Sequence, residues 1–187
     1  MSDPSASFLA EELSDLYIQS GRLREALSDA EDLLKQTPND LNARRILARI
    51  YARLINDNQQ NRIDETYLKK AIEQYQRITE KEPKDNEAWL MLGRLQKIAQ
   101  NSVEAEKAFK SALANEPDSE DALTGLAMVY ADLGDAKNAA DMLRRVSEKS
   151  PSGRSLAALA SAYEPVSYTH LRPPETLLDT VFRLLLE

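Results

Sequence analysis

The chain has 187 residues, of which 42% are hydrophobic and 29% charged, so it is long and apolar enough for one sizeable core. Its formal net charge of −7 argues against generic nucleic-acid binding, because such binding needs a positive surface. The absence of cysteine excludes disulfides and cysteine-based metal or redox sites.

The N-terminus is short and polar, without the apolar segment that a secretion signal needs. We expect residues 1–6 to be a disordered leader and the first helix to open at Phe8. The default location is then the cytoplasm, and the periplasm stays open if the chain is a piece of a longer protein. No stretch approaches the roughly 20 apolar residues of a membrane span, so membrane insertion is not expected.

Prolines recur at regular intervals and divide the chain into blocks. The last two intervals are 34 residues, and the first is 45, which is 34 plus an insertion of 11. Proline has no backbone N–H and ends the helix that precedes it. A period in the thirties is typical of stacked helical hairpins. The recurring prolines are Pro38, Pro83, Pro117 and Pro151.

Apolar and small residues keep constant distances from these prolines. Their spacings of three, four and seven place them on one face of a helix. Small residues beside the leucines let the paired helix approach closely. Between helices, Gly21 and Gly134 suit the left-handed conformation that follows a helix end. The alanine column is Ala26, Ala71, Ala105 and Ala139; the leucine column is Leu13, Leu47, Leu92 and Leu126; the tyrosine column is Tyr17, Tyr51, Gln96 and Tyr130.

The third block carries the fullest pattern. It reads Trp-Leu-Met-Leu-Gly at 89–93, followed by Ala105, Phe109, Ala112 and Pro117. This resembles the tetratricopeptide repeat (TPR) of the bacterial type, with Gln96 in place of the usual tyrosine. The resemblance covers roughly residues 7–163. It implies an all-α fold, a right-handed α-solenoid of about four helical hairpins plus part of a fifth. The repeats are 7–40, 41–85, 86–119 and 120–153, with a partial repeat at 154–164.

The 11-residue insertion lies in the second repeat, between Tyr51 and Ala71. We expect it to lengthen both helices and to form a short loop near residues 57–61, with Asp64 capping the second helix. A protruding hairpin there offers a contact for a partner. Insertions in repeats are more often tolerated at a loop, and we favour that interpretation.

The predicted binding surface comes from the resemblance, which implies that the first helix of each repeat lines a concave groove. Its groove positions transfer to four residues in each of the four repeats. They are Phe8, Glu11, Asp15 and Gln19 in the first, Asn42, Arg45, Arg49 and Arg53 in the second, Glu87, Leu90, Arg94 and Lys97 in the third, and Asp121, Thr124, Met128 and Asp132 in the fourth. Spacing supports part of this, because residues four apart stack along one helix face. The predicted peptide-binding residues are Asn42, Arg45, Arg49, Arg53, Leu90, Arg94, Lys97, Thr124 and Met128.

Cations concentrate in the middle of this predicted groove, although the protein is acidic. The arginine fork fits carboxylates, so we expect a protein or peptide partner with an acidic or C-terminal carboxylate segment, flanked by apolar contact from Leu90 and Met128. The alternative is a solvated face whose arginines pair with nearby acids such as Glu87 or Glu11. The carboxylate clamp of some TPR proteins is not expected, because Glu11 and Asp15 stand where that clamp uses lysine and asparagine.

No pattern of residues in the sequence indicates a catalytic or metal-binding site. The sequence has no cysteine nucleophile, no glycine-rich phosphate loop and no spaced set of metal ligands. The acidic run at 118–121 stands where a helix is expected to start, and acids there stabilise free backbone amides. We therefore predict a non-catalytic scaffold or adaptor, without cofactor or metal. The alternative is a TPR module truncated from a larger enzyme or a secretion or assembly protein.

The pattern breaks from Pro165 onward. Residues 165–187 resemble a translated sequencing adapter, which makes them a non-native tail; the alternative is a genuine capping helix at 175–186. The only histidine, His170, lies in this tail, so it receives no catalytic or metal role. The unfinished fifth repeat leaves an apolar face at Leu156, Ala160 and Tyr163, through which a homo-oligomer is conceivable.

Overall fold

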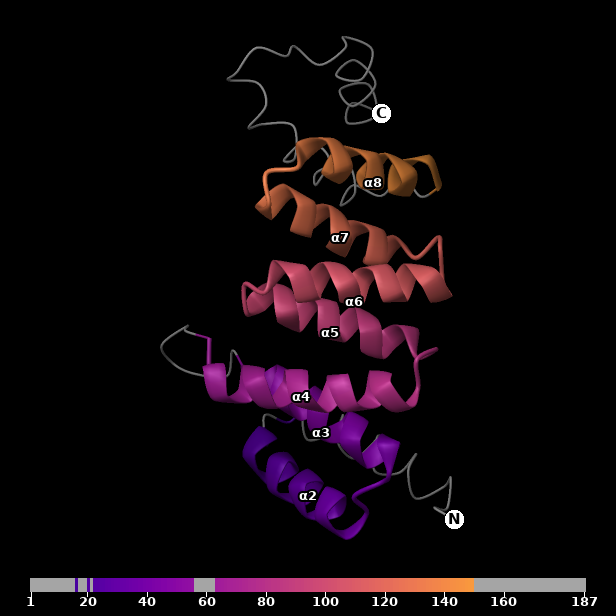
Figure 1. The fold of residues 1–187 in the computed structure, drawn as a ribbon. Helices are drawn as coiled ribbons and strands as arrows, with labels where there is room; N and C mark the ends of the chain where they lie inside the picture. Colours follow the sequence, from indigo (N-terminus) through magenta and orange to yellow (C-terminus); the bar gives the residue numbers. More distant parts are fainter. Residues whose placement is uncertain (1–15, 17–19, 21, 56–62, 150–187) are drawn as a thin grey trace. The chain divides into compact units, whose positions relative to one another are not determined.

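The computed structural model describes residues 16, 20, 22–55 and 63–149. Within these residues the chain is all-α, as the sequence predicted, and no strand occurs. Within each of the two compact units of the chain, each helix packs against the next one along the sequence (Figure 1). The helices are α2 (Leu23–Gln36), α3 (Leu41–Leu54), α4 (Glu65–Lys81), α5 (Asn86–Ile98), α6 (Ser102–Asn115), α7 (Glu120–Asp132) and α8 (Ala136–Lys149).

The helices belong to two compact units, Met1–Gln100 and Asn101–Glu187. In the first unit, α3 packs against both α2 and α4, and α4 packs against α5. In the second unit, α7 packs against both α6 and α8. Each of these pairs joins two helices that follow one another in the sequence. Stacked helical hairpins have this contact pattern.

Three of the four recurring prolines lie directly after helices, as the sequence predicted, and Pro151 lies outside the described residues. Pro38, Pro83 and Pro117 follow the C-terminal caps of α2, α4 and α6. A backbone hydrogen bond of 3.0 to 3.1 Å closes each of these turns around the proline. The donors are the N–H groups of Asp40, Asp85 and Ser119, and the acceptors are the carbonyls of Thr37, Glu82 and Glu116, respectively. The proline carbonyls are also occupied, because they accept from the side chains of Arg44, Trp89 and Arg145 at 2.8, 2.9 and 3.1 Å.

Aspartates begin four of the described helices, and at the start of α8 the side chain of Asp135 accepts from the N–H of Asn138 at 3.1 Å. Asp40 and Asp85 accept backbone N–H bonds at the starts of α3 and α5, and Asp64 does so from Thr66 and Tyr67 at the start of α4. The predicted cap at Asp64 is therefore confirmed. The acidic run at 118–121 also lies at a helix start, since Glu120 and Asp121 form the first turn of α7.

The predicted columns form the core of each unit. Ala71, Tyr75 and Ile78 on α4 are at most 2% exposed, and Leu47 and Ala48 on α3 are buried with them. The second unit repeats the arrangement with Ala105, Phe109 and Ala112 on α6, Leu126 and Ala127 on α7, and Ala139, Leu143 and Val146 on α8.

The insertion lengthens the two flanking helices unequally. Helix α4 has 17 residues against 14 in α6, and α3 has 14 against 13 in α5. Ile55 is buried at the end of α3, and its carbonyl accepts from the N–H of Asp64 at 3.0 Å. This bond closes the insertion where α3 ends. The predicted loop at 57–61 lies outside the described residues.

Two turns use a left-handed backbone. Gly134 has φ +76°, as predicted, and Gln100 has φ +59° in the turn after α5. Gly21 lies outside the described residues, as do the leader at 1–6, the partial repeat at 154–164 and the tail at 165–187 with His170. No helix in the described part has both the length and the apolar character to cross a membrane.

Candidate functional site

The predicted arginines of the second repeat lie along one side of α3. Arg45 is held by three groups: one NH donates to Asn42 at 3.0 Å, and another approaches Glu82 at 3.1 Å and Asp85 at 2.5 Å. Burial alone lowers the pKa of Arg45, but the hydrogen bonds and charges of Asp85 and Glu82 outweigh it and raise that pKa. Arg45 therefore ties α3 to the turn before α5.

Arg49, one turn further along α3, forms a looser ion pair. Its guanidinium lies 3.5 Å from the carboxylate of Glu87 on α5, and the side chains are 31% and 62% exposed. The two ion pairs place the start of α5 beside α3, so the first helices of the second and third repeats meet on this side of the unit. The internal pairing that the alternative interpretation anticipated at Glu87 is present in the structure.

A buried tyrosine lies close to these charges. Tyr75 on α4 is 2% exposed. Burial raises its pKa to about 12, the charge of Glu87 adds to the effect, and Arg49 and Arg45 oppose it. The hydroxyl of Tyr75 is therefore within the electrostatic field of the Arg49–Glu87 pair.

Two of the remaining predicted cations, Arg53 and Arg94, are more exposed than Arg45 and Arg49. Arg53 is exposed and has no ion pair among the described residues. Arg94 is exposed and donates to the Sδ of Met91 at 3.9 Å, while Leu90 and Lys97 are half-buried. Leu90, Arg94 and Lys97 follow Glu87 at spacings of three, seven and ten, which place all four on one face of α5.

The predicted residues of the fourth repeat belong to the second unit and are described with it. Thr124 is half-buried on α7, and Met128 on the same helix is 48% exposed. The ion pairs of Arg45 and Arg49 join α3 to α5 and to the turn before it. We name the set Asn42, Arg45, Arg49, Arg53, Leu90, Arg94 and Lys97 the α3–α5 face.

Sequence reasoning missed the partners of the tyrosine column. The hydroxyl of Tyr51 donates to Glu31 at 2.7 Å, and Lys70 approaches the same carboxylate at 3.6 Å. Tyr67 stacks on Tyr51 with ring centroids 6.0 Å apart. Burial makes the largest contribution to raising the pKa of Tyr51, and the hydrogen bond to Glu31 makes the next largest. The constant spacing of these tyrosines from the prolines identified the column, but it gave no signal for the partners, because Glu31 precedes Tyr51 by 20 residues and Glu106 precedes Tyr130 by 24.

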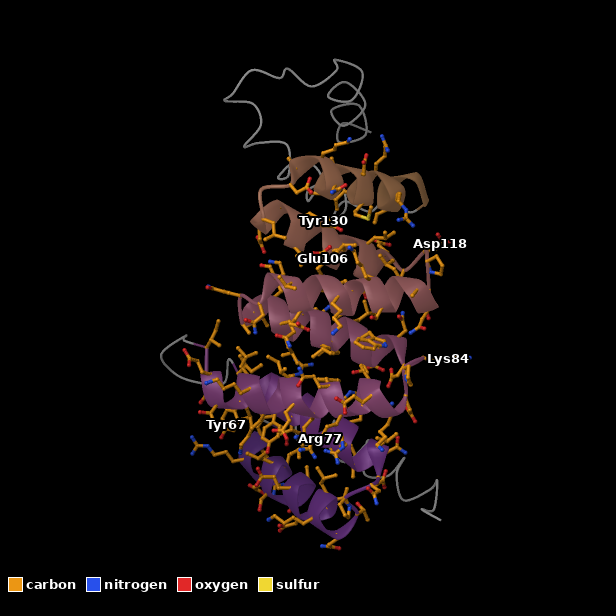
Figure 2. All side chains as sticks on the ribbon, viewed as in Figure 1. Tyr67, Arg77, Lys84, Glu106, Asp118 and Tyr130 are labelled. Atoms are coloured by element: carbon orange, nitrogen blue, oxygen red, sulfur yellow. The ribbon has the colours of Figure 1, made fainter. Side chains whose placement is uncertain are left out.

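The second unit has a related cluster, in which the lysine lies on the same helix as the glutamate. Tyr130 on α7 donates to Glu106 on α6 at 3.2 Å, and Lys110 pairs with Glu106 at 2.6 Å (Figure 2). The hydrogen bond from Lys110 lowers the pKa of Glu106. In both units a tyrosine of one helix thus joins a glutamate–lysine pair, which makes these clusters structural links between repeats.

A hollow of about 1000 Å³ opens between the α2–α3 turn and α4. Arg44, Arg77 and Lys81 line it together with Glu73 and Glu80. Burial, followed by repulsion from Arg77, lowers the pKa of Arg44, whose guanidinium is already bonded to Gln74 and to the carbonyl of Pro38. Arg77 is paired with Glu73 at 2.7 Å. The lining therefore mixes both signs of charge.

The described residues hold no group of three or more histidine, cysteine or acidic side chains placed to bind a metal ion. His170, the single histidine of the chain, lies outside them.

Comparisons with known proteins agree with the repeat pattern. Two models described as tetratricopeptide repeat match residues 12–62 and 98–163, which together span more than half of the chain. No curated protein is similar enough in sequence to count as a match.

Several solved structures share the fold. The crystal structure of MamA has a TM-score of 0.72 and 19% identity over 96% of this chain and 87% of that one. TTC0263, a thermophilic TPR protein of Thermus thermophilus, has a TM-score of 0.66 and 23% identity over 86% and 81%. YrrB, described as a TPR protein with an unusual peptide-binding site, has a TM-score of 0.69 and 15% identity over 94% and 84%. At these identities the likeness concerns the fold.

Proposed function

Because the chain belongs to the tetratricopeptide repeat family, whose modules are generally protein-interaction scaffolds, we propose that it is a non-catalytic scaffold that binds a partner polypeptide on the α3–α5 face. YrrB offers a precedent for peptide binding on this fold, by its description. The observation that carries the proposal is the pair of ion bridges from Arg45 and Arg49 to the start of α5. These bridges align α3 and α5 so that their exposed cations share one surface.

The partner chemistry follows from the charges of this face. Arg49, Arg53, Arg94 and Lys97 carry positive charge on a chain whose net charge is −7. Arginine presents a planar fork that binds a carboxylate through two parallel hydrogen bonds. An acidic segment, or a C-terminal carboxylate, is the ligand that fits, and Leu90 adds apolar contact. Thr124 and Met128 belong to the second unit and are proposed as separate contacts for the same partner.

Arg45 has a different role from its neighbours. Its short bond joins a guanidinium that is 24% exposed to a carboxylate that is 11% exposed. Breaking a largely buried pair leaves a charge without compensation and destabilises the fold. Arg45 therefore positions α5, and substitutions that test partner binding are better made at Arg53 and Arg94.

The test compares two charge-reversal variants of the full chain. Arg53→Glu/Arg94→Glu alters the face, whereas Lys69→Glu/Lys84→Glu changes the net charge equally on exposed lysines of α4 and the turn after it; Lys84 is marked in Figure 2. The probes are labelled peptides of acidic, neutral and basic composition, each with a free and an amidated C-terminus. Fluorescence anisotropy measures their dissociation constants.

We expect acidic peptides to bind the unmodified chain and the lysine variant, and to lose about tenfold or more in affinity for the arginine variant, because two attractive contacts become repulsive. Circular dichroism checks that both variants remain helical. Equal binding of acidic peptides by the two variants contradicts the proposed surface. Preference for neutral or basic peptides contradicts the proposed partner chemistry.

A further inference from the structure

We propose that Glu87 is a built-in competitor for Arg49, so that the α3–α5 face selects partner segments with two carboxylates at alternate positions and discriminates against those with one. This inference rests on the proposed function and specifies which acidic partners it admits. It depends on the contrast between the two ion pairs that join α3 to α5.

The Arg49–Glu87 pair can be displaced by an incoming ligand, and the Arg45–Asp85 pair cannot. The carboxylate of Asp85 is 11% exposed, lies 2.5 Å from Arg45 and also caps α5. The side chain of Glu87 is 62% exposed, and its oxygen lies 3.5 Å from Arg49. A pair that is long and open to water contributes little free energy, so another carboxylate is able to replace Glu87.

A single external carboxylate gains little from this exchange. Glu87 is attached to the same molecule as Arg49, so its effective concentration at the guanidinium is far above that of a free ligand. The incoming group makes the same kind of ion pair that it breaks. Net binding energy must come from a second contact that the free protein does not already satisfy.

Arg53 provides that second contact. It lies one turn beyond Arg49 on α3 and has no ion pair among the described residues. The rise along a helix separates residues four apart by about 6 Å. In an extended chain, side chains on one side are two residues apart, or about 6.5–7 Å. Carboxylates at alternate positions of an extended segment therefore match the spacing of Arg49 and Arg53.

The experiment uses three blocked peptides without terminal charges. One has glutamates at alternate positions, the second has adjacent glutamates, and the third has one glutamate replaced by glutamine. Each is titrated at millimolar concentration and low salt into the unmodified chain, Glu87→Gln and the control Glu80→Gln, and NMR chemical shifts give the dissociation constants. Glu80 is an exposed acid on α4 without an ion pair among the described residues, so its substitution makes the same charge change.

We expect the unmodified chain to bind the alternate peptide most tightly. Glu87→Gln should raise the affinity for the one-carboxylate peptide by about two- to fivefold, the range that one exposed ion pair supplies, and Glu80→Gln should not. An unchanged one-carboxylate affinity in Glu87→Gln, or an equal rise in Glu80→Gln, overturns the competitor role and leaves the proposed function standing. Absence of binding by every peptide to both the unmodified chain and Glu87→Gln overturns this inference together with the acidic internal segment as the partner, whereas the C-terminal carboxylate is tested by the free and amidated peptides described above.

Discussion

The close contact between Gly125 and Phe109 gives a sharp test of the packing between α6 and α7. A Cβ added at Gly125 would lie 2.4 Å from both Cε1 and Cζ of Phe109 and 2.9 Å from Cδ1. Phe109 is 1% exposed, so its ring lies inside the packed core. The substitution Gly125→Ala must therefore push the ring or separate the two helices.

Two effects of Gly125→Ala oppose each other. Replacing a mid-helix glycine by alanine stabilises a helix by about 1 kcal/mol. Forcing an extra methyl into a packed core costs about 1–3 kcal/mol, and the short distances favour the upper part of that range. We expect a net loss of about 1–2 kcal/mol, seen as a fall of about 2–4 °C in Tm for each kcal/mol.

A double-mutant cycle with Phe109→Leu isolates the steric contribution. Once the ring is removed, Gly125→Ala should become stabilising, and the coupling between the sites should be about 1–3 kcal/mol. Gly134→Ala is the matched control, because Gly134 has φ +76° and nothing within 4 Å of an added Cβ. Its cost should be the same with and without Phe109. Urea unfolding followed by circular dichroism measures all six proteins, and an equal effect of Gly125→Ala in both backgrounds would refute the steric argument.

Three further predictions concern other described residues. Gln100→Gly should stabilise the chain by about 0.5–1 kcal/mol, because Gln100 is an exposed residue at φ +59° and glycine adopts that conformation without strain; a lower urea midpoint would contradict this. Asp64→Ala should cost about 1 kcal/mol through loss of the α4 cap, and Asp64→Ser should recover most of it; equal stabilities of the two variants would be inconsistent with a capping role. Tyr75 has a pKa raised from 10.0 to about 12 in the folded chain, so the unfolded chain loses this proton first, and the contribution of Tyr75 to stability is complete below pH 10 and declines as pH rises through 12. Tyr75→Phe should therefore reduce the loss of stability between about pH 10 and about pH 12, measured by urea midpoints; an unchanged loss would show that Tyr75 titrates normally.

The sequence by itself determined the repeat architecture. The intervals between Pro38, Pro83 and Pro117 predicted where helices end, and the alanine and leucine columns predicted which side chains are buried. These features are readable because helix periodicity and helix termination depend on residues within a few positions of each other. The cap at Asp64 was predictable for the same reason.

The tertiary structure decided which charges of the candidate site are already engaged. Arg45 and Asp85 are 40 positions apart, and Arg49 meets Glu87 across the same interface. The spacing of four residues shows that Arg45, Arg49 and Arg53 lie on the same side of one helix. It does not show which carboxylates of the next repeat lie opposite them. The end of α3 at Ile55 was likewise set by a bond to Asp64 beyond the insertion.

The difference between the two kinds of information is the range of the interactions involved. Capping, helix termination and amphipathic spacing act within one or two turns, so the order of residues is sufficient to predict them. Ion pairs between repeats and the fit of Phe109 against Gly125 depend on how two helices approach in space. That approach is set by the packing of all the side chains between the helices, so only the folded chain decides it.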